Sequence, residues 1–171
     1  MQTRIEFKAP WSTLLKVSTA AVSVFLLGVA VAVQVAGRSM DVPGAGAYMA
    51  FMAALPLVIL LFTALYTIRG YVLVDRTLLV KRLVWCTEVP LAGLASAEVD
   101  PAATARSIRT FGIGGAFSFS GYFWNSRLGR YRAFATDLRR AVVLRFSKRT
   151  VIVTPDDPQR FATDIQQLMN L

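Results

Sequence analysis

The chain has 171 residues, a formal net charge of +9 and a hydrophobic content of 55%, with one cysteine and no histidine. This composition excludes an intrachain disulfide, a zinc site of the cysteine and histidine type, and the Ser-His-Asp and Cys-His forms of catalysis. Paired carboxylates are the remaining option for catalysis, and the close pairs are Glu98 with Asp100 and Asp156 with Asp157, of which the second has a helix-capping role. We expect no catalytic residue, no metal and no cofactor.

Residues 1–12 are expected to form a tail that contains a short strand. Charged and apolar residues alternate from Arg4 to Lys8, which is typical of a half-buried strand, and Pro10 ends the pattern. Such a strand could add to a sheet edge of the later domain, and a disordered tail is the alternative. Trp11 is expected at a membrane–water interface, where indole rings accumulate.

Two apolar runs, residues 17–36 and 47–68, contain no charged residue. A helix needs about 20 apolar residues to cross the hydrocarbon core of a bilayer, so each run is long enough. Because the turn at residues 37–46 is short, the two helices must be antiparallel, and residues 13–68 are predicted to form a transmembrane hairpin. A cleaved signal peptide is a poorer interpretation of the first run, which exceeds the usual length of about 7–15 residues.

Basic residues flank the outer ends of the two runs. They are Arg4, Lys8, Lys16, Arg69, Arg76, Lys81 and Arg82, whereas the turn offers only Arg38, beside Asp41. Because cytoplasmic loops of membrane proteins carry an excess of Lys and Arg, both ends of the chain are predicted to be cytoplasmic. The expected location is the cell membrane, with two crossings.

Small residues recur at every fourth position in the first apolar run and again from the last residue of the turn into the second run. They are Gly28, Ala32, Ala36, Gly46, Ala50 and Ala54. Such spacing lets two helix backbones approach closely in lipid, where packing drives helix association. We expect these residues to pack helices together, and a chance occurrence in apolar helices is the alternative.

From residue 69 onward the composition changes to that of a β-rich domain. Residues 70–74 and 78–85 are rich in β-branched and aromatic residues and flank a turn, which predicts a hairpin. Further strands are expected at residues 95–99, 131–136, 141–147 and 151–154. Cys86 follows three apolar residues and is expected to be a buried structural thiol.

The chain closes with the signature of an amphipathic helix. An aspartate, Asp157, is followed by Pro158 at the first helical position, which is a strong start signal. Phe161, Ile165 and Leu168 then fall on one face, so this helix is expected to cover one open end of a sheet.

Residues 106–129 combine glycines with aromatic residues and show no regular period, which predicts an irregular loop. Its aromatic residues are expected either in the headgroup region of the bilayer or in the domain core. The candidates for the headgroup region are Phe111, Phe117, Phe119, Tyr122 and Trp124. A phosphate-cradling loop is disfavoured, because no helix follows the glycines.

Basic residues dominate residues 106–149, where Asp137 is the single acid. Arg130 and Arg132 alternate with Tyr131, so both guanidinium groups are expected on one face of a strand. The predicted positive rim consists of Arg130, Arg132, Arg139, Arg140, Lys148 and Arg149. It suits anionic phospholipid headgroups or an acidic partner, and plain solvation is the alternative. Nucleic acid is not expected, because no nucleic-acid motif accompanies the charge.

A series of short strands followed by one helix is the outline of the pleckstrin-homology (PH) fold. The glycine-rich segment at residues 111–115, the Leu-Gly-x-Tyr pattern at residues 128–131 and the Thr-Pro-x-x-Pro pattern at residues 154–158 resemble bacterial PH-domain membrane proteins. In that family two transmembrane helices precede a PH-like domain. The resemblance implies an α+β domain over residues 69–171, with bent antiparallel sheets or a partly open barrel capped by the C-terminal helix. It implies no settled ligand.

These observations predict a membrane-anchored, non-enzymatic interaction module at the cytoplasmic face. It would recruit a protein or peptide partner, self-associate as a homo-oligomer, or contact anionic lipid. The alternative is an accessory subunit of a membrane transporter or enzyme complex that docks through its transmembrane helices.

Overall fold

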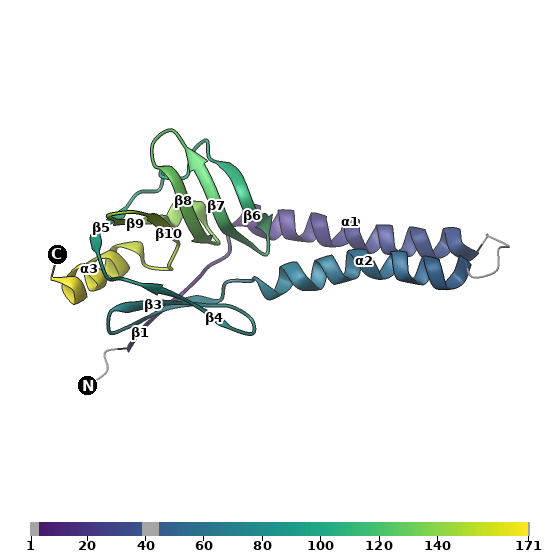
Figure 1. Ribbon diagram of the computed structural model, residues 1–171, viewed down its shortest axis with the longest axis horizontal. Helices are drawn as coiled ribbons and strands as arrows, with labels where there is room; N and C mark the ends of the chain where they lie inside the picture. The colour runs from purple at the N-terminus through teal and green to yellow at the C-terminus, as the bar shows by residue number, and fades with distance from the viewer. Residues whose placement is uncertain (1–3, 39–44, 171) are drawn as a thin grey trace.

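The computed structural model describes residues 4–38 and 45–170. Two long helices, α1 (Thr13–Arg38) and α2 (Ala45–Leu65), lie side by side and extend away from a domain made of two sheets (Figure 1). Both helices are long and apolar enough to cross a bilayer, and few of their side chains are buried within the chain. Most of the predicted turn at residues 37–46, including Asp41, lies outside the described residues.

The first sheet, sheet A, holds four antiparallel strands in the order β1-β2-β3-β4. Their bounds are Arg4–Lys8, Gly70–Val74, Thr77–Lys81 and Cys86–Pro90. The strand expected near the N-terminus is present as β1, and it pairs along the whole of β2. The residues before α1 therefore belong structurally to the domain that follows α2.

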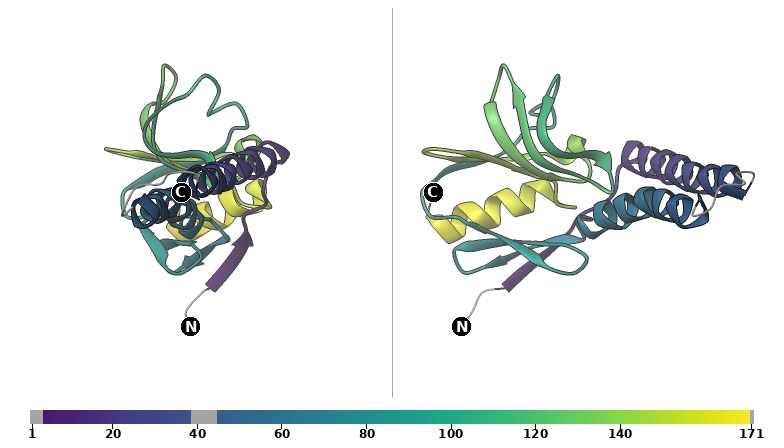
Figure 2. Two further views of the ribbon diagram at one scale, coloured as in Figure 1. Left: turned by 90° about the vertical axis from the view of Figure 1, so that its right-hand side faces the viewer. Right: turned by 45° about the vertical axis from the view of Figure 1, so that its right-hand side comes forward.

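The second sheet, sheet B, has the strand order β5-β9-β10-β8-β7-β6. The bounds of β5 to β10 are Leu94–Val99, Ile108–Ala116, Ser118–Asn125, Gly129–Ala135, Val142–Phe146 and Thr150–Val153. All neighbours are antiparallel except β8 and β10, which are parallel. The two sheets diverge as a wedge and do not close into a barrel (Figure 2). The predicted α+β fold with a C-terminal helix is thereby confirmed.

The C-terminal helix α3 (Pro158–Met169) lies in this wedge, at the end away from α1 and α2 (Figure 1). The Asp157 carboxylate accepts a hydrogen bond from the Arg160 backbone N–H at 3.0 Å, which caps the first turn as predicted. Phe161 is fully buried and packs edge-on against Phe7 and Tyr71, with ring centroids 5.0 and 6.2 Å away. The apolar face of α3 therefore closes one end of the wedge.

The expectation of an irregular loop at residues 106–129 is wrong, because most of this segment forms the β6–β7 hairpin. Its register shifts twice, between Arg109 and Phe111 and between Gly114 and Ala116, so its side chains follow no simple alternation. Gly112 and Gly121 face each other across the two strands with φ angles of 109° and 145°. A Cβ atom on Gly121 would lie 2.2 Å from the Phe111 carbonyl oxygen. These glycines permit a close approach of two strands.

Tyr71 joins the two sheets by buried hydrogen bonds. Its hydroxyl donates to the Phe134 carbonyl oxygen at 2.6 Å and accepts from the Thr154 backbone N–H at 3.1 Å. Burial raises the pKa of Tyr71 to about 12 from its usual value of about 10. The resulting stabilisation is complete below about pH 10 and is lost as the pH rises through about 12, because the unfolded chain ionises first.

Tyr71→Phe should destabilise the domain by about 1–3 kcal/mol, because it leaves two buried backbone groups each short of a partner. The measurement is thermal unfolding of the full-length protein in neutral detergent, followed by circular dichroism. Tyr48→Phe is the matched control, since Tyr48 is exposed on α2, and its effect should stay within about 0.5 kcal/mol. Equal melting temperatures for both variants would contradict the link between the sheets.

Gly121→Ala should cost more than about 2 kcal/mol, because the new methyl group meets the Phe111 carbonyl at a backbone angle that L-residues rarely adopt. The control is Gly28→Ala on α1, where a Cβ atom would have no neighbour within 4 Å. That change should be neutral or stabilising by up to about 1 kcal/mol. The same unfolding assay compares the two, and a Gly121→Ala protein as stable as the parent would refute the close strand pairing.

Candidate functional site

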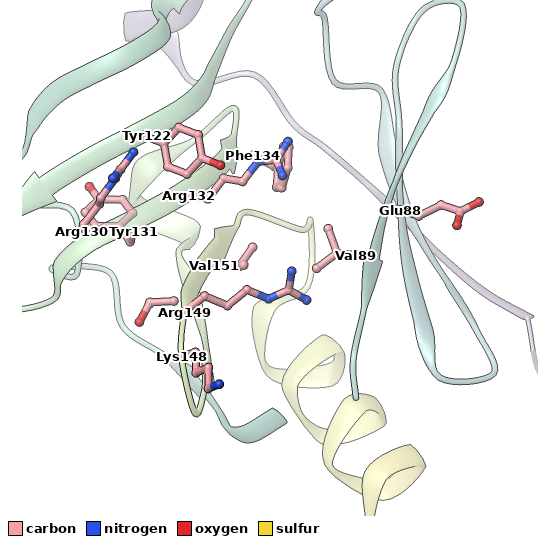
Figure 3. Close-up of a pocket in the computed structure, with 11 residues that line it drawn as sticks. Glu88, Val89, Tyr122, Arg130, Tyr131, Arg132, Phe134, Lys148, Arg149 and Val151 are labelled. Atoms are coloured by element: carbon pink, nitrogen blue, oxygen red, sulfur yellow. The ribbon is translucent and has the colours of Figure 1, made fainter. Parts of the chain in front are cut away.

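A cavity of about 390 Å³ opens between β8 in sheet B and the edge strand β4 in sheet A (Figure 3). We call it the basic cavity, because four cationic side chains line it together with a single acid, Glu88. The cations are Arg130, Arg132, Lys148 and Arg149. Apolar side chains, including Val89, Phe134 and Val151, form the rest of its wall. The cavity therefore combines positive charge with apolar surface.

The alternation predicted for β8 places Arg130 and Arg132 on one face, as expected. The Arg130 guanidinium lies 4.8 Å from the centroid of the Tyr122 ring, and that of Arg132 lies 4.7 Å from the Phe134 ring. Stacking of this kind holds a guanidinium in place and leaves its edge free to donate hydrogen bonds. Both groups are thus oriented in the cavity before any ligand arrives.

Lys148 and Arg149 reach the same cavity from the β9–β10 turn, at the end of the domain away from α1 and α2 (Figure 1). Arg149 donates to the Pro90 carbonyl oxygen at 2.9 Å and so connects the turn to the end of β4. Within residues 4–38 and 45–170, none of the four cavity cations forms an ion pair. Their charge is available to a ligand.

The other two residues of the predicted rim, Arg139 and Arg140, lie elsewhere. Both pair with Asp137, with N···O distances of 3.5 and 3.7 Å, and Arg140 also donates to the Asp156 carbonyl oxygen at 2.6 Å. Asp137 caps the short 3₁₀ helix η1 (Leu138–Arg140) that carries them. The six basic residues therefore do not form one continuous rim.

The five predicted interfacial aromatic residues also lie in separate places. Phe111 is 74% exposed on β6 and Trp124 is 47% exposed on β7. Tyr122 lies under Arg130, Phe117 packs edge-on against Trp11 at 6.3 Å, and Phe119 packs against a second core cluster. They do not form a single aromatic surface.

The predicted small-residue positions lie on exposed parts of α1 and α2. The contact between the helices uses other residues, because Ala30 and Ala53 are buried and Met49 packs directly on Gly37. Gly28, Ala32, Ala36, Gly46, Ala50 and Ala54 therefore do not build the core of this hairpin. Their packing against other helices stays a prediction.

A second cavity, of about 560 Å³, lies between the end of α2 and the two sheets. We call it the helix-side cavity, and it shares Tyr122, Arg132 and Phe134 with the basic cavity. Its central cation is Arg82, which is only 7% exposed, and burial lowers the pKa of this guanidinium. Sequence reasoning treated Arg82 as a flanking charge and, with Arg76 and Lys81, as a partial echo of the basic first hairpin of eukaryotic PH domains, and it did not predict its burial. The sequence feature that could have indicated its burial is its position directly before three apolar residues.

Arg82 connects α2 to both sheets. It donates to the Tyr66 carbonyl oxygen at 2.8 Å, to the Ser120 hydroxyl at 2.8 Å and to the Thr87 hydroxyl at 3.1 Å. All three acceptors are neutral, so these bonds fix the side chain without neutralising it.

The expectation that Cys86 is buried is wrong, because its thiol is exposed. The three apolar residues before it, Leu83, Val84 and Trp85, form the turn between β3 and β4 and are themselves exposed. Apolar neighbours in a sequence therefore did not indicate a core position here.

Comparison with known proteins agrees with this architecture. The model of the bacterial PH domain family matches residues 69–169, which hold every strand from β2 to β10 and the capping helix α3. No curated protein and no solved structure matches the chain. The match covers more than half of the sequence. The chain belongs to the bacterial PH-domain family.

Proposed function

We propose that this protein is a membrane-anchored, non-enzymatic interaction module that recruits an acidic segment of a partner protein at the cytoplasmic face of the cell membrane. The observation that supports this proposal is the basic cavity, where four unpaired cations meet one acid. Helices α1 and α2 are the anchor, and both chain termini are cytoplasmic.

Helices α1 and α2 have the length and the exposed apolar surface of membrane spans. Helix α1 has 26 residues, which at 1.5 Å per residue give about 39 Å, against about 30 Å for a hydrocarbon core. Its first turns are attached to the β6–β7 turn, since the Ser18 hydroxyl donates to the Gly115 carbonyl and the Phe117 backbone N–H donates to Thr19 at 2.9 Å. The remaining length suffices for one crossing. The domain is therefore held against the membrane surface.

A protein segment fits the basic cavity better than the bilayer does. The β9–β10 turn, which carries Lys148 and Arg149, lies at the end of the domain opposite to α1 and α2 (Figure 1). The bilayer around these helices would not reach this end. A partner that approaches from the cytoplasm meets this end first. Val89 and Val151 beside the cations suit a segment that mixes acidic and apolar side chains.

The double variant Arg130→Glu with Lys148→Glu should weaken binding of a fluorescent deca-glutamate peptide by at least about tenfold. Neither residue forms a hydrogen bond or ion pair to another described side chain, so the fold should be unaffected. The measurement is fluorescence anisotropy with full-length protein in neutral detergent. Binding by the parent protein should also fall as salt rises.

The matched control is Arg76→Glu with Arg145→Glu, which changes the net charge equally at two exposed positions outside the cavity. This control should change the affinity by no more than about twofold. Equal losses in the two double variants would show that net charge alone attracts the peptide, which would refute the cavity as the binding site.

The orientation can be tested with Cys86, the sole cysteine of the chain and an exposed one. A membrane-impermeant maleimide should label it in inside-out vesicles and leave it unlabelled in intact cells. The matched control is Gly46→Cys in a Cys86→Ser background, which places the thiol near the opposite ends of the helices and should reverse the pattern. Labelling of Cys86 in intact cells would overturn the cytoplasmic placement.

A further inference from the structure

The helix-side cavity contains a buried cation without a counter-ion. Arg82 is 93% buried, and in the described part of the chain it forms no ion pair. The rings of Tyr66 and Phe134 lie 5.1 and 5.6 Å from its guanidinium and offset only part of the cost of burying a charge. Arg132 lines the same cavity as a second unpaired cation. This pair favours an anion between them.

The mouth of this cavity lies beside the membrane anchor. Phe62 and Thr63, from the last turns of α2, form part of its wall. The β3–β4 turn points toward the helices (Figure 1) and exposes Leu83, Val84 and Trp85, with Val84 71% exposed. Because exposed apolar side chains next to a membrane helix enter the headgroup region, Arg82 lies close to the depth of lipid phosphates.

The cavity is also lined by apolar groups suited to lipid chains. Phe111 and Ile113 on β6 line it together with Phe62 of α2. The exposure of Phe111 in the isolated chain is explained if a lipid chain covers this ring. Phosphate and acyl groups thus have separate partners within one cavity, the cations Arg82 and Arg132 and the apolar side chains of α2 and β6.

We propose that the helix-side cavity holds one anionic phospholipid of the surrounding leaflet, with its phosphate on Arg82 and Arg132 and the upper part of its acyl chains along Phe62, Phe111 and Ile113. Guanidinium groups bind phosphate oxygens through paired, charge-assisted hydrogen bonds. Arg82 retains N–H groups beyond the three bonds that hold it in place. The site shares Arg132 with the basic cavity but also uses Arg82, which does not line the basic cavity, and it needs no partner protein.

Native mass spectrometry of the full-length protein in neutral detergent tests this inference. Phosphatidylglycerol and phosphatidylcholine with identical acyl chains are added separately. We expect one phosphatidylglycerol per chain to be retained at activation energies that remove phosphatidylcholine, with at least about a tenfold preference for the anionic lipid. Equal retention of the two lipids would overturn the proposal, and this comparison requires no variant.

Two variants from different strands test the location. Arg132→Glu should reduce the phosphatidylglycerol-bound fraction by at least about tenfold, and Phe111→Asp should reduce it as well, because it places a carboxylate beside the acyl chains. Arg145→Glu is the control, with the same charge change as Arg132→Glu at an exposed site outside the cavity. Equal losses in Arg132→Glu and Arg145→Glu would refute the site.

A competition experiment distinguishes a site for lipid from a site for free phosphate. Inorganic phosphate and soluble glycerol phosphate, added in excess, should leave phosphatidylglycerol bound, because neither replaces the contacts of the acyl chains. Displacement by either would show a site for soluble phosphate, which would overturn the lipid proposal.

The deca-glutamate assay on Phe111→Asp should be unchanged, and Arg130→Glu with Lys148→Glu should retain phosphatidylglycerol. Failure of one proposal is thereby distinguishable from failure of the other.

Discussion

The hydrogen bonds of Arg82 are the interaction on which the rest of the arrangement depends. This one side chain reaches the Tyr66 carbonyl at the end of α2, Thr87 on β4 and Ser120 on β7, so it joins the helical pair to both sheets. A guanidinium remains charged at any pH that the protein meets, and it cannot be surrounded by dry apolar packing at acceptable cost. The sheets must therefore remain apart at this end, and the wedge between them contains cavities where a closed barrel would have a core.

The opposite end of the wedge is closed by ordinary packing. Phe161 of α3 fills the space between the sheets, and Tyr71 satisfies buried backbone groups of sheet B with its hydroxyl. The space around α3 is thus filled by apolar contacts with paired polar groups, whereas the helix side and the β4 edge of the wedge have charge next to open space. This asymmetry directs the cavities toward the helices and toward the β4 edge, where the two proposed ligands would enter.

Features set by neighbours in the sequence could be predicted, and features set by distant contacts could not. The β1 alternation, the Asp157 cap and the shared face of Arg130 and Arg132 depend on local periodicity, and all three are present. The β6–β7 hairpin was missed because its two register shifts erase the alternation and its glycines serve a cross-strand contact. Arg82 was missed because two of its acceptors lie 16 and 38 residues away.

Local pairing also explains which basic residues remain free to bind a ligand, and one of these residues couples the two cavities. Arg139 and Arg140 share the single carboxylate of Asp137, which lies within three residues of both, whereas Arg132 has no such neighbour and lines both cavities. An anion bound to Arg132 in the helix-side cavity would lower the positive electrostatic potential of the basic cavity, because Arg132 lines both. By thermodynamic linkage, an acidic segment bound in the basic cavity would reduce the affinity of the helix-side cavity for that anion by the same factor. Because they share this arginine, the two cavities are coupled electrostatically, and a ligand bound in one would change the affinity of the other.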